Sequence, residues 1–146
     1  MNELVENQIK QGSIKEFSSV ATQNEFTEVA ERGLWESERI LIDTYFADST
    51  SILDLGCGSG RATIPLHNVG YHVTGIDITA PMIETARKVA DDKELKIDYR
   101  VGDATQLEFA DNTFDGAIFA NNGWAQIPGK ANRQKALTET YRVLKP

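Results

Sequence analysis

Residues 51–61 read S-I-L-D-L-G-C-G-S-G-R, and this stretch decides the fold. Its apolar start predicts a short buried strand over 51–55, which the glycines that follow bring to an end. Glycine adopts positive φ without strain and lets the main chain approach a ligand closely. A plain turn from strand to helix needs one or two glycines. Three at alternate positions, Gly56, Gly58 and Gly60, therefore favour a turn that binds a ligand.

Strand and helix patterns alternate along the rest of the chain. Strands are predicted over 51–55, 72–77, 96–101 and 114–120, and helices over 34–46, 61–69, 80–90 and 132–144, after a loosely helical segment over 1–33. Such alternation is typical of parallel strands joined by right-handed crossovers, and hence of an open α/β sheet. Ligands of these sheets bind beyond the carboxyl ends of the strands, so the residues that follow each strand are the candidates for function.

Composition narrows the class of protein. The chain has 146 residues, 40% of them hydrophobic, which suits one domain with a real core. Its net charge of −7 disfavours a nucleic-acid partner held by charge. The single cysteine excludes an internal disulfide, no apolar run is long enough to cross a bilayer, and the first residues are acidic, unlike a signal peptide. We expect a cytoplasmic protein without a membrane partner.

Polar residues follow the second and third predicted strands. Asp77 ends the second strand, where a carboxylate can accept hydrogen bonds from both hydroxyls of a ribose. Without other evidence, Asp77 would be interpreted as a solvated residue at the end of a strand. The preceding glycine turn favours a contact between Asp77 and a ribose. Asp103 and Ala104 follow the third strand and could read an adenine ring through a carboxylate and a main-chain amide. An ordinary Asx-type turn explains them equally well.

The remaining polar candidates carry less information. Asn121 and Asn122 follow the fourth predicted strand, either as part of the same crevice or as a plain polar loop. His67 and His72 are the only histidines, and packing or surface roles suit both. We therefore assign no catalytic residue and expect no metal site. In the N-terminal region Phe17, Phe26 and Trp35 could line a pocket, although packing on the sheet is the preferred role of Phe26.

Four motifs in order resemble those of the class I S-adenosylmethionine-dependent methyltransferases. They are LDLGCGSGR at 53–61, GIDIT at 75–79, GDATQLEFADNTFDGAI at 102–118 and YRVLKP at 141–146, and the resemblance covers residues 50–146. A nicotinamide-dependent oxidoreductase is a third hypothesis, beside a methyltransferase and a cofactor-binding module without turnover. It is disfavoured because dinucleotide dehydrogenases prefer G-x-G-x-x-G, whereas this chain has G-x-G-x-G.

The resemblance implies a cofactor, S-adenosyl-L-methionine, and an in-line transfer of its methyl group to a small-molecule acceptor, with S-adenosyl-L-homocysteine as product. It also implies roles for single residues. Asp54, Gly56, Gly58 and Gly60 would cradle the methionine part, Asp77 would hold the ribose, Asp103 and Ala104 would read the adenine, Ile78 and Leu107 would sandwich it, and Asn121 would face the methyl donor.

The same resemblance implies a Rossmann-like sheet of seven strands in the order 3-2-1-4-5-7-6. Only the 3-2-1-4 half can be built here, so we expect a chain truncated after the helix that precedes strand five. Strand four would then be an exposed edge, covered by a second copy of the chain in a homodimer or by the N-terminal segment. We expect residues 1–49 to form a helical cap on the substrate side and residues 50–146 to form the cofactor-binding core. A binding module without turnover is the alternative to an enzyme.

Overall fold

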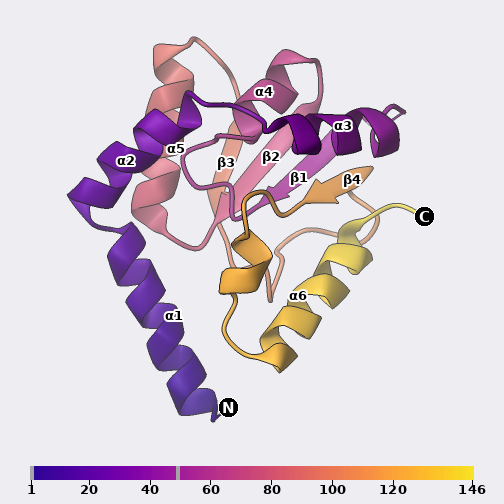
Figure 1. Cartoon of the computed structure of the whole chain (residues 1–146). Helices are drawn as coiled ribbons and strands as arrows, with labels where there is room; N and C mark the ends of the chain where they lie inside the picture. The colour runs from indigo at the N-terminus through magenta and orange to yellow at the C-terminus, as the bar shows by residue number, and fades with distance from the viewer. Residues whose placement is uncertain (1, 49) are drawn as a thin grey trace.

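Four parallel strands form the centre of the protein in the computed structural model, which describes residues 2–48 and 50–146 (Figure 1). They are β1 (Ser51–Leu55), β2 (His72–Asp77), β3 (Asp98–Val101) and β4 (Gly116–Ile118), and their spatial order is β3-β2-β1-β4. All three neighbouring pairs are parallel. The α/β class and the predicted 3-2-1-4 order are confirmed. The predicted boundary at 49/50 touches Ser49, which lies outside the described residues.

Within the described residues, six α-helices and one 3₁₀ helix accompany the sheet. They are α1 (Glu3–Phe17), α2 (Val20–Ala30), α3 (Glu36–Tyr45), α4 (Thr63–Asn68), α5 (Ala80–Asp92), α6 (Lys130–Val143) and η1 (Gly123–Gln126). The loosely helical N-terminal region forms two helices because the chain breaks at Ser18 and Ser19. The Ser19 hydroxyl accepts a hydrogen bond from the Thr22 amide and so caps the start of α2. No helix in the ranges 2–48 and 50–146 is long and apolar enough to cross a membrane.

The fourth strand is shorter than its apolar run predicted. Phe114 forms an isolated parallel bridge with Leu144 outside the sheet, because its amide donates to the Val143 carbonyl at 2.9 Å and its carbonyl accepts from the Lys145 amide at 2.9 Å. At the other end, Asn121 and Asn122 take left-handed conformations, and the chain turns into η1. The apolar character of this run thus predicted the burial of Phe114 correctly, but not that Phe114 would lie outside the sheet.

The outer edge of β4 is open over the described part of the chain, where β1 is the only strand that pairs with it. No strand of the described N-terminal residues pairs with this edge. α2 packs beside α5 at the opposite side of the sheet, and α1 extends from it (Figure 1). α3 instead packs Ile42 and Phe46 against one face of the sheet, near Ile52 and Ile118. A homodimer through this edge stays a prediction.

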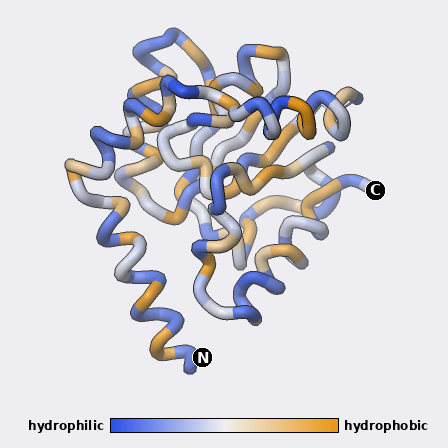
Figure 2. The backbone as a smooth tube through the Cα atoms, in the orientation of Figure 1, coloured by the Kyte–Doolittle hydropathy of each residue, from blue (hydrophilic) through white to orange (hydrophobic). Residues whose placement is uncertain are grey.

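Hydrophobic residues from both faces of β1 form the core. On one face Leu53 and Leu55 pack with Ile76 of β2 and Val143 of α6, and on the other Ile52 packs with Ile42 of α3. Burial of these side chains from water is the main force that holds the helices to the sheet. α1 differs, because hydrophilic and hydrophobic residues alternate along its whole length (Figure 2) and none of its residues is buried.

Gly75 in β2 gives a test of core packing. A Cβ atom at this position would lie 2.8 Å from the Tyr99 ring and 3.0 Å from the Cys57 sulfur, so Gly75→Ala should lower the free energy of unfolding by about 1–3 kcal/mol. Gly12→Ala is the control, because nothing lies within 4 Å of its Cβ position inside α1. It should stabilise the protein by up to about 1 kcal/mol through helix propensity. Urea unfolding measures both, and an undiminished stability of Gly75→Ala would contradict the packing.

Candidate functional site

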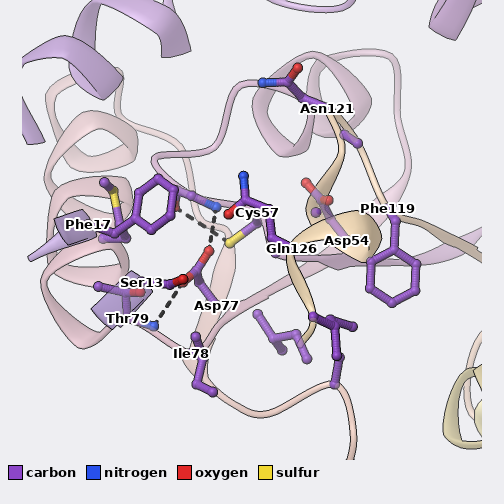
Figure 3. A pocket seen from close by; sticks show the side chains of 18 of the residues that line it. Ser13, Phe17, Asp54, Cys57, Asp77, Ile78, Thr79, Phe119, Asn121 and Gln126 are labelled. Atoms are coloured by element: carbon purple, nitrogen blue, oxygen red, sulfur yellow. Dashed lines mark hydrogen bonds between the residues drawn. The ribbon is translucent and has the colours of Figure 1, made fainter. Parts of the chain in front are cut away.

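A cavity of about 220 Å³ opens at the carboxyl ends of the four strands (Figure 3). Strand ends and the glycine turn form one side of it, and Ser13 and Phe17 of α1 form another. Every binding residue predicted from the sequence lines this cavity except Gly60 and Leu107. Those present are Asp54, Gly56, Gly58, Asp77, Ile78, Asp103, Ala104 and Asn121. The topology therefore brings together residues that were predicted from three separate motifs and from the end of the fourth strand.

The glycine turn lies beneath the cavity in a strained shape that needs glycine. Gly56, Gly58 and Gly60 have φ values of 70°, 53° and 95°. The amides of Gly56 and Cys57 both donate to the Ile76 carbonyl, at 2.8 and 2.9 Å, which fixes the turn on β2. Gly60 was predicted to contact the ligand, but it lies on the other side of the turn. A Cβ atom on Gly60 would collide with the Tyr99 hydroxyl below the turn. Gly60 thus makes room for packing and does not line the cavity.

Asp77 joins three elements at the edge of the cavity. Its Oδ2 accepts a hydrogen bond from the Gly58 amide at 3.1 Å, and its Oδ1 accepts from the Thr79 amide at 2.8 Å, just before α5 (Figure 3). Burial raises the pKa of this carboxyl, while the two amides oppose that rise. Each carboxylate oxygen has two lone-pair sites, so Asp77 can accept further bonds from a ligand in the cavity.

Asp54, in β1, is a buried carboxylate with one oxygen unused. Its Oδ2 accepts a hydrogen bond from the Thr63 hydroxyl at 2.6 Å, whereas its Oδ1 has no hydrogen-bond partner among the described residues. Burial raises the pKa of Asp54 to about 6. Leaving a buried acceptor unpaired is costly, and a positively charged or hydrogen-bond-donating ligand group would relieve that cost. This oxygen fits a ligand that carries an ammonium group.

Asp103 forms the Asx-type turn that its sequence left open, and it also lines the cavity. Its Oδ1 accepts from the amide and the hydroxyl of Thr105, at 2.9 and 2.8 Å, which is an Asx-type turn. Its Oδ2 accepts from the Lys10 ammonium at 2.5 Å, at the cavity. Burial alone would raise its pKa, but the bonds from Lys10 and Thr105 outweigh burial and leave the pKa lowered. The carboxylate is therefore charged at neutral pH.

The apolar lining of the cavity differs in part from expectation. Ile78 lines it, but Leu107 is buried in the core with Leu55 and Phe114 and lies outside the cavity lining in the part of the chain described. Leu107 therefore does not sandwich a ligand with Ile78. Met82 of α5 lines the cavity instead. The sequence did not identify Met82 as a candidate, because apolar residues on one face of a helix commonly pack in a core.

Phe17 and Phe26 reach the cavity from α1 and α2, with their rings edge to face at a centroid distance of 5.5 Å. Phe26 also holds the glycine turn, because its carbonyl accepts a hydrogen bond from the Ser59 hydroxyl and its ring lies 3.4 Å from the Cβ position of Gly58. Phe26 thus both packs against the glycine turn and lines the cavity. Trp35 lies outside the cavity lining among the described residues.

A buried ion pair ties α3 to the glycine turn. Arg61, the residue after Gly60, donates two hydrogen bonds to the Glu38 carboxylate, at 2.6 and 2.8 Å, and a third to the Gly33 carbonyl at 2.8 Å. The Trp35 ring lies beside its guanidinium, 5.7 Å away. Burial would raise the pKa of Glu38, but the contacts with Arg61 outweigh it and lower the pKa. This pair fixes α3, and the connection between α2 and α3, to the glycine turn.

The buried charge of Asp54 predicts a pH dependence of stability. The folded state binds this proton more tightly than the unfolded chain, so the contribution of Asp54 to the free energy of unfolding should rise as pH falls from about 7 to about 4, by up to about 3 kcal/mol. Asp54→Asn lacks this contribution, and its stability advantage over the parent should shrink across the same window. Urea unfolding at several pH values measures the difference. Parallel profiles for the two proteins would contradict the prediction, and Asp43→Asn, on the exposed side of α3, is the control.

Comparison with known proteins gives the family. The sequence profile described as "Methyltransferase domain" matches residues 52–146. A demethylmenaquinone methyltransferase of Lactiplantibacillus plantarum is 36% identical over 114 residues, which are 75% of this chain and 46% of that protein. A ubiquinone biosynthesis O-methyltransferase of Maricaulis maris is 38% identical over 96 residues, which are 65% of this chain and 36% of that protein.

A solved structure agrees with these sequence relatives. The crystal structure of a SAM-dependent methyltransferase from Methanosarcina mazei superposes with a TM-score of 0.70 at 34% identity, over 78% of this chain and 54% of that one. The chain thus spans about half the length, or less, of the proteins that it matches. From the matched profile and these relatives together, the chain belongs to the methyltransferase domain family, as its four motifs predicted.

Proposed function

We propose that this chain binds S-adenosylmethionine in the cavity and directs its methyl group to a small-molecule acceptor. The observation that carries the proposal is the pair of buried carboxylates beside the glycine turn: Asp54 has an unpaired oxygen among the described residues, and Asp77 lines the cavity at the end of β2. Together they suit a ligand with an ammonium group and two neighbouring hydroxyls, which S-adenosylmethionine has.

The proposed contacts follow the order of the strands. The amino-acid part of the cofactor would lie on Gly56 and Gly58, near Asp54. The ribose would lie on Asp77, and the adenine would lie between Ile78 and Met82 with its amine toward Asp103 and a ring nitrogen toward the Ala104 amide. Asn121 would face the methyl group from the end of β4. Gly60 and Leu107 are left out, because one packs on Tyr99 and the other lies in the core.

The chemistry requires little of the protein beyond orientation. When bound, the sulfonium of the cofactor supplies an already activated methyl group. The chain's own residues would bind and orient the two reactants and exclude water, which is the larger part of catalysis in such a transfer. Neither histidine is placed to act as a base, because His67 and His72 lie outside the cavity lining in residues 2–48 and 50–146. We therefore propose no catalytic base.

An apolar, planar acceptor suits the remaining wall of the cavity. Phe17, Phe26, Val29 and Ile127 supply hydrophobic and aromatic surface there. The relatives named above are methyltransferases of menaquinone and ubiquinone biosynthesis, which supports a quinone-like or phenolic acceptor for this chain. The same wall comes largely from α1 and α2, so we propose that the N-terminal helices are the substrate-side cap. The cytoplasmic location, the absence of a nucleic-acid partner and the homodimer stay predictions.

A coupling experiment tests the ribose contact directly. A hydroxyl bonded to a charged carboxylate contributes about 1.5–3 kcal/mol, so removing both ribose hydroxyls from S-adenosylhomocysteine should weaken binding at least about ten-fold. In Asp77→Asn the same change of ligand should matter much less, because the charged acceptor is gone. Calorimetry with the two ligands and the two proteins gives the coupling. An equal loss of affinity in both proteins would mean that the ribose does not contact Asp77. Asp43→Asn, which removes a charge elsewhere, is the matched control.

Turnover separates an enzyme from a binding module. The proposal predicts release of S-adenosylhomocysteine when the protein is mixed with S-adenosylmethionine and a short-chain quinol or catechol. Gly58→Val should abolish both binding and release, because a side chain there is strained at positive φ and meets Phe26. Binding of the cofactor without release, over a broad panel of small acceptors, would favour the module. Binding of NAD in place of S-adenosylmethionine would contradict the proposal.

A further inference from the structure

α1 lies against the cavity although it contributes no buried residue to the protein. Its inward side, with Lys10, Ser13, Ile14 and Phe17, forms part of the cavity wall. α1 ends at Phe17, and Ser18 and Ser19 connect it to α2. A helix with so little buried surface depends on individual contacts to keep its place.

Two polar contacts hold this helix over the cavity. At its first half, Glu6 accepts a hydrogen bond from the Asn132 side chain at 3.0 Å, close to the start of α6. Gly129 makes room for the Glu6 carboxylate, which lies where a Cβ atom of residue 129 would be. One turn further along α1, the Lys10 ammonium lies 2.5 Å from Oδ2 of Asp103. The two contacts connect α1 to the segment after β3 and to the first turn of α6.

The Lys10 contact occupies the one oxygen of Asp103 that a ligand could use. Oδ1 already accepts two bonds from Thr105, whereas Oδ2 accepts only from Lys10 among the described residues. Lys10 reaches Oδ2 from the helix that lines the cavity, which is also the side from which a base would approach. An adenine amine that approaches Oδ2 from the cavity would therefore meet the Lys10 ammonium on the same side of this oxygen.

We propose that Lys10 is an intrachain competitor of the nucleobase: it occupies Oδ2 of Asp103 in the unliganded protein and must leave when an adenine amine binds there. This inference rests on the proposed function. It makes α1 a lid whose closed position is held by the same carboxylate that recognises the base. Lys10 thus sets the affinity for the cofactor without touching the methyl group.

The proposal predicts changes of opposite sign to those of an ordinary binding lysine. Removing the ammonium in Lys10→Met should tighten binding of S-adenosylhomocysteine by about two- to five-fold, since a partly exposed ion pair of this kind is modest in strength. Salt screens the pair, so the parent protein should bind this ligand more tightly at about 500 mM than at about 50 mM NaCl. Binding to Lys10→Met should lack this rise with salt.

Two further variants control the experiment. Lys15→Met removes the same charge from the same helix, at a position without a described hydrogen bond or ion pair, and should keep the parent's affinity and salt dependence. Lys10→Arg retains the pair and should behave as the parent does. Hydrogen exchange without ligand gives a second readout: amides over 4–17 should exchange faster in Lys10→Met than in Lys15→Met.

Calorimetry with S-adenosylhomocysteine decides among the outcomes. Tighter, salt-insensitive binding to Lys10→Met alone, with faster exchange in α1, supports the competitor. Unchanged or weaker binding to Lys10→Met, while the parent protein binds normally, overturns this inference and leaves the proposed function standing. If neither the parent nor any variant binds the ligand, the proposed function fails and the competitor fails with it.

Discussion

The hydrogen bonds that Asp77 accepts from the Gly58 and Thr79 amides are the contacts on which the rest of the site depends. They join the turn after β1 to the end of β2 and to the start of α5, so one carboxylate fixes the relative position of three elements. The glycine turn adopts its left-handed conformations within this frame. Because the frame consists largely of main-chain atoms, its shape depends on glycine at few positions and tolerates different side chains around it.

Buried charge is the second constraint on this molecule. Asp54 and Asp77 are both held in the protein at raised pKa values, with burial as the main cause in each. A sheet of this size could be more stable with apolar residues at these positions, because an uncompensated buried carboxylate is costly. Sites that bind charged ligands commonly retain such groups in spite of the cost, and perturbed carboxyls in a cavity are typical of function.

Much of the fold followed from local pattern. The alternation of strands and helices gave the parallel sheet, the family resemblance gave its strand order, and the position of Asp77 at the end of a strand gave its place in the cavity. Contacts between distant segments could not be predicted in the same way. Tyr99 beneath Gly60 and Lys10 on Asp103 join residues far apart in the chain, and neither belongs to a motif. The core position of Leu107 likewise depends on how α6 packs, which hydrophobicity alone does not fix.

The central claim is that a nucleoside with an amino-acid tail lies across the carboxyl ends of β1, β2 and β3. A crystal structure of the protein with S-adenosylhomocysteine tests it most directly. The account predicts ribose hydroxyls on the Asp77 carboxylate, the amino-acid tail along Gly56 and Gly58, and the adenine between Ile78 and Met82. A nucleoside bound elsewhere, with Asp77 contacting only the Gly58 and Thr79 amides, would contradict it.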